Sequence, residues 1–128
     1  MNVNQKGNIG LLKVISDLYS KGFTVFEPFD DYNPVDCIAM DSEGNIFRLQ
    51  VKYRSPDRND AYEISASTIV NKKSVPINRG LIDYWAVYLS DLDKIVYMPI
   101  SAMEGKKVHY ITRKQLSDVD ERLKSAPC

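Results

Sequence analysis

Three polar residues, Asp36, Gln50 and Lys52, have side-chain types that together could hydrolyse a phosphodiester. That reaction needs an activated water, a leaving oxygen relieved of charge and a phosphate held in line, and bound Mg²⁺ supplies much of all three. Mg²⁺ keeps several waters, so one or two carboxylates with other oxygen ligands suffice. Asp36 offers a carboxylate, Gln50 a side-chain carbonyl and Val51 a backbone carbonyl. Lys52 could orient or deprotonate the attacking water.

A β-hairpin is predicted to bring these residues together. Residues 35–41 are largely apolar, and residues 45–54 alternate, with Arg48, Gln50, Lys52 and Arg54 on one face. The connecting turn ends in Gly44, which suits a left-handed third position of a three-residue loop. A loop of residues 42–44 makes Asp41 face Asn45, so the numbers of paired residues sum to 86. This places Asp36 opposite Gln50 with Cβ atoms roughly 5 Å apart. A slip of one residue would move the whole set to the other face.

The remaining elements must support that hairpin. Apolar residues at helical spacing predict a helix over residues 9–21, with Asn8 as N-cap and Gly22 following its end. Its apolar stripe is expected to contain Leu11, Leu12, Ile15, Leu18 and Tyr19.

Strands are expected at residues 23–27, 61–65, 84–89, 95–100 and 108–111, with a polar loop at 66–80 and a final helix at 113–124. Residues 84–89 are apolar on both faces, which favours a position near the centre of the sheet.

Composition indicates one domain spanning residues 1–128, because 128 residues with 44% hydrophobic content can bury a core without staples. Cys37 and Cys128 form neither a disulfide framework nor a zinc-ligand spacing, and Cys37 is expected to be a small buried hydrophobe. No segment resembles a signal peptide or a membrane span, so a reducing cytoplasm is the expected setting and no membrane partner is expected.

The net charge is zero, with 17 basic and 17 acidic residues, but basic residues gather in one window. Residues 48–79 hold seven basic side chains against three acidic ones, a possible footprint for phosphates. The candidate DNA contacts besides Lys52 are Arg48, Arg54, Arg58, Lys72, Lys73 and Arg79. Each of these could equally be ordinary surface charge, and His109 is expected to be a surface or structural residue.

Pro34-Val35-Asp36 followed by Gln50-Val51-Lys52 resembles the signature of the PD-(D/E)XK nucleases. The ordered set of motifs over residues 5–100, including Lys6 to Gly10 and Ile82 to Tyr88, is similar to the small group-I-intron-encoded homing endonucleases of that fold. The resemblance implies an α/β fold with a restriction-endonuclease-like mixed β-sheet flanked by helices. It also implies Mg²⁺-dependent, site-specific cleavage of double-stranded DNA by a homo-oligomer, since two active sites cut two strands most simply.

The chain departs from the family pattern at two positions. Leu11 stands where the family often places Glu, and Gln50 fills the acidic slot, so Asp36 is the remaining carboxylate unless Glu27 turns inward. Three alternatives to an active endonuclease therefore stay open. They are an inactive DNA-binding relative, a resolvase of branched DNA such as Holliday junctions, and an interaction domain without a nucleic-acid role, which the zero net charge favours.

Overall fold

The structure, a computed structural model, describes residues 1–30, 33–65, 67–70, 73–76, 80–103 and 108–112. Their elements are α1 (Val3–Ser20), β1 (Thr24–Phe26), β2 (Cys37–Met40), β3 (Ile46–Arg54), β4 (Ala61–Ser65), β5 (Ser67–Val70), β6 (Lys73–Pro76), β7 (Tyr84–Leu89), β8 (Lys94–Pro99), the 3-10 helix η1 (Ile100–Met103) and β9 (Val108–Thr112). The predicted helix at 113–124 lies outside the described residues. No helix in the described part of the chain is long and apolar enough to cross a membrane.

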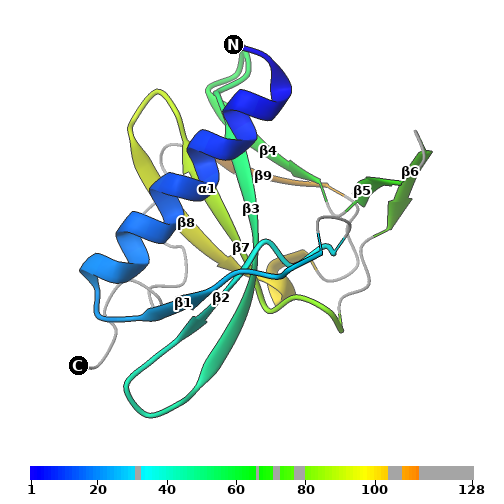
Figure 1. The fold of residues 1–128 in the computed structure, drawn as a ribbon. Coiled ribbons are helices and arrows are strands. Elements are labelled where there is room, and N and C mark those ends of the chain that lie inside the picture. Colours follow the sequence, from blue (N-terminus) through cyan, green and yellow to red (C-terminus); the bar gives the residue numbers. More distant parts are fainter. Residues whose placement is uncertain (31–32, 66, 71–72, 77–79, 104–107, 113–128) are drawn as a thin grey trace.

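A mixed five-stranded sheet forms the centre of the fold, in the order β1-β2-β3-β7-β8 (Figure 1). β3 and β7 run parallel, while the other neighbouring strands are antiparallel. The predicted α/β class with a mixed sheet is therefore confirmed. Every residue of β7 is buried, as its two apolar faces predict, although β3 rather than β7 is the middle strand.

The shorter strands pair outside this sheet. The predicted strands at 61–65 and 108–111 correspond to β4 and β9, which pair with each other. The prediction of a polar loop at 66–80 is wrong for residues 67–70 and 73–76, which pair as β5 and β6. Thr68, Ile69, Val70 and Val75 are β-branched residues that favour strands, and the polar residues between them hid this preference.

Helix α1 begins six residues before the predicted start. Asn2 is the N-cap, because its side chain accepts from the Gln5 N–H at 2.9 Å while Gln5 Oε1 accepts from the Asn2 N–H at 2.9 Å. Asn8 therefore lies inside the helix, and the expectation that it caps the helix is wrong. The predicted end is confirmed, since Gly22 has φ +91° and follows the C-cap Lys21.

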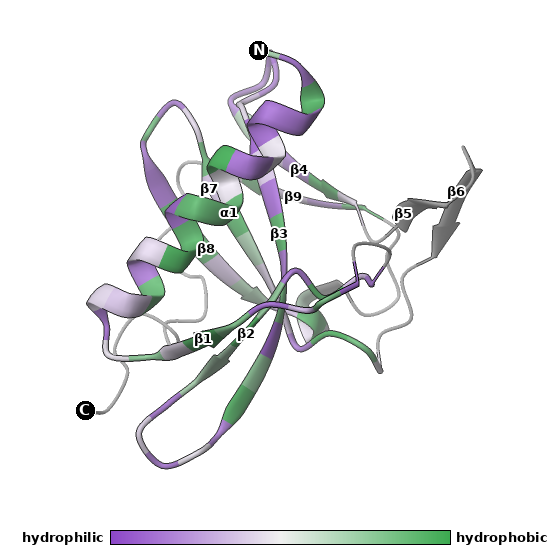
Figure 2. Cartoon of the chain, viewed as in Figure 1, coloured by the Kyte–Doolittle hydropathy of each residue, from purple (hydrophilic) through white to green (hydrophobic). Residues whose placement is uncertain are grey.

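The buried face of α1 follows Gly10, Val14 and Leu18 at intervals of four residues. Hydrophobic and hydrophilic residues alternate around the helix (Figure 2). Leu12 is 67% exposed and Tyr19 is 59% exposed, so the predicted apolar stripe is wrong for these two residues. Leu12 and Tyr19 do not belong to the row of residues, spaced four apart, that faces the sheet.

The β2–β3 hairpin has the predicted register. Cys37 pairs with Leu49 and Ile38 with Arg48, so each pair of numbers sums to 86 as expected. Gly44 has φ +87° at the third loop position. The Asp41 carboxylate holds the turn by accepting from the Asn45 N–H at 2.9 Å.

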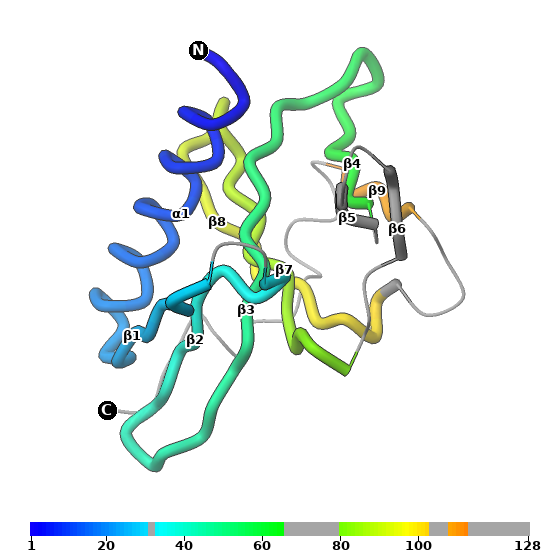
Figure 3. The backbone as a smooth tube through the Cα atoms, turned by 45° about the vertical axis from the view of Figure 1, so that its right-hand side comes forward, coloured from blue at the N-terminus to red at the C-terminus, as the bar shows by residue number. Residues whose placement is uncertain are grey.

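The two faces of the sheet are covered by different layers, and α1 lies on one side of β3 while β4 and β9 lie on the other (Figure 3). One core cluster joins α1 to Leu49 and Ala86, and the other joins Trp85 and Val87 to the β4–β9 layer. Gln50 pairs with Trp85 in the parallel β3–β7 register, so the predicted polar face of β3 is the face turned away from α1.

Replacing Gly7 by alanine is expected to stabilise the protein by about 0.5–1 kcal/mol, because glycine inside a helix loses more backbone entropy on folding than alanine does. A Cβ atom at Gly7 would meet no heavy atom within 4 Å. Urea unfolding measures the change. Gly22→Ala is the opposing control and should destabilise, because its φ of +91° disfavours a Cβ atom. A loss of stability in Gly7→Ala would contradict the expectation.

Candidate active site

Asp36 lies where the regular ladder between β2 and β3 ends. Its N–H donates to the Leu49 carbonyl at 2.8 Å, and its Oδ2 accepts from the Val51 N–H at 2.7 Å. The carboxylate thus takes the place of the backbone acceptor that a continued strand would offer. The Val35 N–H donates to Asn33 Oδ1 at 2.9 Å rather than to the Val51 carbonyl. The Asp36 carboxylate is therefore hydrogen-bonded to the backbone of β3 at this break in the ladder.

Burial raises the pKa of the Asp36 carboxyl, and it outweighs the opposing effects of the Val51 N–H and the Lys52 charge. The protein therefore does not fully offset the free-energy cost of burying the ionised Asp36 carboxylate. An added cation at this carboxylate would supply the missing compensation.

Lys52 lies on the same face of β3 as Gln50, two residues further along the strand. Burial, followed by the neighbouring Arg54 charge, lowers the pKa of Lys52 to about 8, although Asp36 acts in the opposite direction. Within the described residues, the Lys52 ammonium makes no hydrogen bond or ion pair. The arrangement gives an amine that loses its proton at lower pH than an ordinary lysine does and that has no fixed partner among the described residues.

Gln50 is 7% exposed and is held by a residue that sequence reasoning missed. Trp85, which is fully buried, donates its indole N–H to Gln50 Oε1 at 3.1 Å. The two residues pair across the parallel strands β3 and β7. The sequence contains no local signal for this pairing, since 35 residues separate the partners.

The donor set available to a metal is small. The described residues contain no group of three His, Cys, Asp or Glu side chains that could hold an ion. The second oxygen of Asp36 and the Val51 carbonyl remain, and they fit Mg²⁺, which prefers oxygen ligands and retains several waters.

Leu11 offers no metal ligand, and the Glu27 carboxylate lies at the neighbouring strand end. Leu11 is partly buried against the core beneath α1, as its place in an apolar stripe predicts. Glu27 is exposed beyond the end of β1. Its charge acts on Cys37, whose pKa is raised to about 12 by burial first and then by Asp36 and Glu27. Cys37 is fully buried and free, which confirms its expected role as a small core residue.

The predicted DNA contacts are in different situations. Arg48 forms a two-pronged ion pair with Asp83, at 2.9 Å and 3.0 Å, and donates to the Gly80 carbonyl at 2.7 Å. Arg54 donates to the Glu63 carbonyl at 2.7 Å, and Arg58 is exposed in the β3–β4 connection. Lys73 begins β6, although its side chain is not described, and Lys72 and Arg79 lie outside the described residues.

Replacing Asp83 by alanine is expected to destabilise the protein by about 1–3 kcal/mol, because the Arg48 N–H and guanidinium lose their common acceptor. Urea unfolding of Asp83→Ala and Arg48→Ala measures the cost. Asp57→Ala offers a control at another carboxylate that accepts backbone N–H groups in a turn. Unchanged stability in Asp83→Ala would contradict a structural role for Arg48.

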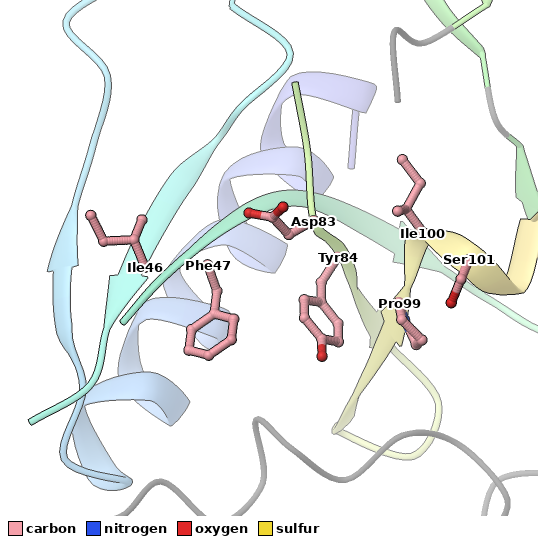
Figure 4. A pocket seen from close by; sticks show the side chains of 7 residues that line it. All are labelled: Ile46, Phe47, Asp83, Tyr84, Pro99, Ile100 and Ser101. Atoms are coloured by element: carbon pink, nitrogen blue, oxygen red, sulfur yellow. The ribbon is translucent and has the colours of Figure 1, made fainter. Parts of the chain in front are cut away.

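A hollow of about 320 Å³ lies at the start of β3 and β7 and contains none of the predicted catalytic residues. Its lining consists of Ile46, Phe47, Asp83, Tyr84, Pro99, Ile100 and Ser101. Figure 4 shows the rings of Phe47 and Tyr84 side by side, with the Asp83 carboxylate directed away from them. Because Asp83 is paired with Arg48, this hollow offers a mainly apolar surface rather than a second centre for hydrolysis.

The order of the mixed sheet and the helix across one of its faces define a restriction-endonuclease-like fold. The chain belongs to the PD-(D/E)XK endonuclease family, whose model matches residues 1–126. It is therefore a DNA endonuclease, as the resemblance implied.

Among solved structures, the chain is similar in fold to a bacterial homing endonuclease, I-Ssp6803I, with a TM-score of 0.75 and 18% identity. The match covers 88% of this chain and 80% of that one. No curated protein sequence matches the chain.

Proposed function

We propose that the protein is a Mg²⁺-dependent, site-specific endonuclease of double-stranded DNA that acts in intron homing. The observation that supports this most directly is the hydrogen bond from the Val51 N–H to the Asp36 carboxylate where β2 leaves the β3 ladder, together with the mutual effect of the Asp36 and Lys52 charges on their pKa values. The family membership and the similarity to a homing endonuclease support the choice of substrate.

In the proposed mechanism, Asp36 and the Val51 carbonyl hold the metal and Gln50 is the third polar residue of the centre. When bound, Mg²⁺ polarises the phosphate and lowers the pKa of water. The neutral amine of Lys52 accepts the proton of the attacking water, and the resulting ammonium offsets charge on the phosphate. The Val51 N–H keeps the Asp36 carboxylate in place through its 2.7 Å hydrogen bond.

The proposal includes a homo-oligomer, since two centres cut two strands most simply and a symmetric oligomer matches a pseudo-palindromic target. Arg48, Arg54, Arg58, Lys72, Lys73 and Arg79 remain the proposed phosphate contacts. Of those whose side chains are described, Arg58 is the most accessible. The buried free thiol of Cys37 is compatible with a reducing cytoplasm as the place of action.

The decisive experiment incubates the protein with Mg²⁺ and a DNA library of candidate intron-free insertion sites, and maps double-strand breaks. Lys52→Ala should lose the breaks, whereas Lys94→Ala should retain them because Lys94 is exposed at the start of β8. Equal cleavage by the parent and Lys52→Ala would overturn the assigned centre.

Leu11 favours a second candidate, a catalytically weak or inactive DNA-binding relative. A parent that binds DNA in a salt-dependent manner but makes no breaks would support it. Leu11→Glu separates the two, because an added carboxylate that restores cleavage would mean that the centre is intact and lacks only a ligand. The same assay on a four-way junction separates both from a branched-DNA resolvase.

A further inference from the structure

We propose that Trp85 is a positioning residue that turns the Gln50 amide so that its NH₂ group, rather than its carbonyl oxygen, faces the reacting phosphate. Gln50 would then donate a hydrogen bond to a non-bridging phosphate oxygen of the DNA rather than bind the metal. This inference rests on the proposed function and assigns a different role to the residue in the acidic slot of the family signature.

The chemistry of tryptophan fixes the orientation of the amide. An indole N–H is a donor and never an acceptor. The Gln50 atom at 3.1 Å from Trp85 Nε1 must therefore be the carbonyl oxygen, and a flipped amide would place two donors against each other. Trp85 is fully buried, so no water replaces Gln50 as its acceptor without a rearrangement of the core.

The NH₂ group is consequently the part of Gln50 that remains available. Among the described residues, no acceptor takes a hydrogen bond from Gln50 Nε2, yet this atom is not a buried atom without a partner. The small exposed surface of Gln50 therefore includes its amide nitrogen. The regular register ends at Cys37 and Leu49, so the predicted Asp36–Gln50 pair is not part of it. Asp36 is instead held by the two neighbours of Gln50, because its N–H donates to the Leu49 carbonyl and its Oδ2 accepts from the Val51 N–H. The free donors of Gln50 therefore lie on the stretch of β3 that holds the proposed metal ligand.

A donor at this place suits an anion better than a cation. An amide N–H next to Mg²⁺ would be repelled, whereas a phosphate oxygen brought in by the metal is an acceptor of matching charge. The carbonyl oxygen already uses one of its two lone pairs to accept from Trp85. Mg²⁺ would thus be held by Asp36 and the Val51 carbonyl, with waters completing the shell.

Metal affinity tests the role of Gln50 without requiring cleavage. Mn²⁺ binding, followed by electron paramagnetic resonance, is compared in the parent, Gln50→Met and Asp36→Asn. Gln50→Met should stay within roughly threefold of the parent, whereas Asp36→Asn should weaken binding by roughly tenfold or more. Equal weakening in the two variants would overturn the proposal, because Gln50 would then be a ligand.

DNA affinity provides the second measurement. In Ca²⁺, used to hold DNA without rapid cleavage, Gln50→Met should bind DNA roughly tenfold more weakly than the parent, the cost of one hydrogen bond to a charged oxygen. Undiminished DNA affinity would count against a phosphate contact. These two measurements also separate the inference from the proposed function, since a parent that binds Mn²⁺ and DNA but never cuts would refute only the nuclease reaction.

The orientation itself is tested by the indole resonance, which is unambiguous because Trp85 is the one tryptophan in the sequence. In proton–nitrogen correlation spectra, Gln50→Met should move this resonance upfield as its hydrogen bond is lost. Tyr88→Phe is the matched control, since it removes a 2.7 Å hydrogen bond to Asp93 on the opposite face of β7 and should leave the indole unchanged. An indole resonance that does not move in Gln50→Met would overturn the assigned positioning.

Discussion

Replacing Lys52 by methionine is expected to lower the cleavage rate by a factor of roughly 10²–10⁴, the usual contribution of a general base. Methionine keeps much of the length and volume of the lysine stem but has no amine to take a proton. The amine is well suited to that task, because burial and Arg54 lower its pKa to about 8. Single-turnover cleavage at saturating Mg²⁺ measures the loss.

The pH dependence distinguishes a base from a fixed charge. The neutral amine accumulates above the folded-state pKa of about 8, so the parent rate should rise towards pH 8 and level off beyond it. The residual rate of Lys52→Met should lack this inflection. Lys52→Arg retains the positive charge but stays protonated across the same range. Full activity in Lys52→Arg would show that position 52 supplies charge alone.

Lys52→Met is also expected to stabilise the fold by about 1–3 kcal/mol at pH 7, where the parent must bury a charged amine. Between about pH 8 and 10.5, the unfolded chain binds more protons at this position than the folded chain does. Parent stability should therefore rise with pH through that window, and this rise should disappear in Lys52→Met. Denaturant unfolding at several pH values measures it and shows that lost activity is not lost folding.

The part of the centre that the sequence predicts is the part that local chemistry determines. The alternation of β3 and the left-handed Gly44 set the register of the hairpin, and these signals lie within a few residues of one another. The parallel pairing of β3 with β7 depends on chain segments 35 residues apart, so Trp85 could not be assigned to Gln50 from sequence. The pairing of strands that are distant in the sequence does not alter the hydrophobic periodicity of either strand, so the sequence pattern does not reveal it.

The pattern of charges in the sequence likewise does not show which basic residues form ion pairs within the fold. Arg48 belongs to a regular stripe of polar residues on β3, but its guanidinium is already hydrogen-bonded to the Asp83 carboxylate. The start of α1 was missed for another reason. The apolar spacing becomes regular only near residue 9, directly after Asn8, which is a suitable N-cap residue. The reciprocal hydrogen bonds of Asn2 and Gln5 instead begin the helix earlier. Helix propensity is therefore a weak guide to where a helix begins when its N-terminal capping hydrogen bonds are formed.

Asp36 and Lys52 share an energetic property that is typical of functional sites. Burial raises the pKa of Asp36 and lowers that of Lys52, so each charged form is destabilised by its surroundings. A fold selected for stability alone would place neutral residues at both positions, whereas a catalytic centre tolerates the cost. Neutral substitutions should therefore remove activity without harming the fold.

Asp36→Asn is the sharpest form of this prediction, with an expected loss of cleavage of about 10³-fold or more, since Asp36 is the proposed metal carboxylate. The asparagine carbonyl can still accept from the Val51 N–H, so the hairpin should remain intact. Its NH₂ group replaces the oxygen left for the metal. Cleavage assays at increasing Mg²⁺ measure the loss, and excess Mg²⁺ should not restore the rate.

Glu27→Gln is the matched control, since it neutralises an exposed carboxylate at the neighbouring strand end by an equally small change. It should leave the Mg²⁺ dependence of cleavage within roughly twofold of the parent. Asp36→Asn should also unfold at slightly higher urea than the parent near neutral pH, because its raised pKa means that ionised Asp36 costs stability there. If Glu27→Gln instead lost activity as fully as Asp36→Asn, Glu27 would be a second metal carboxylate, supplied from beyond the end of β1 in place of the glutamate that the family often has where this chain has Leu11.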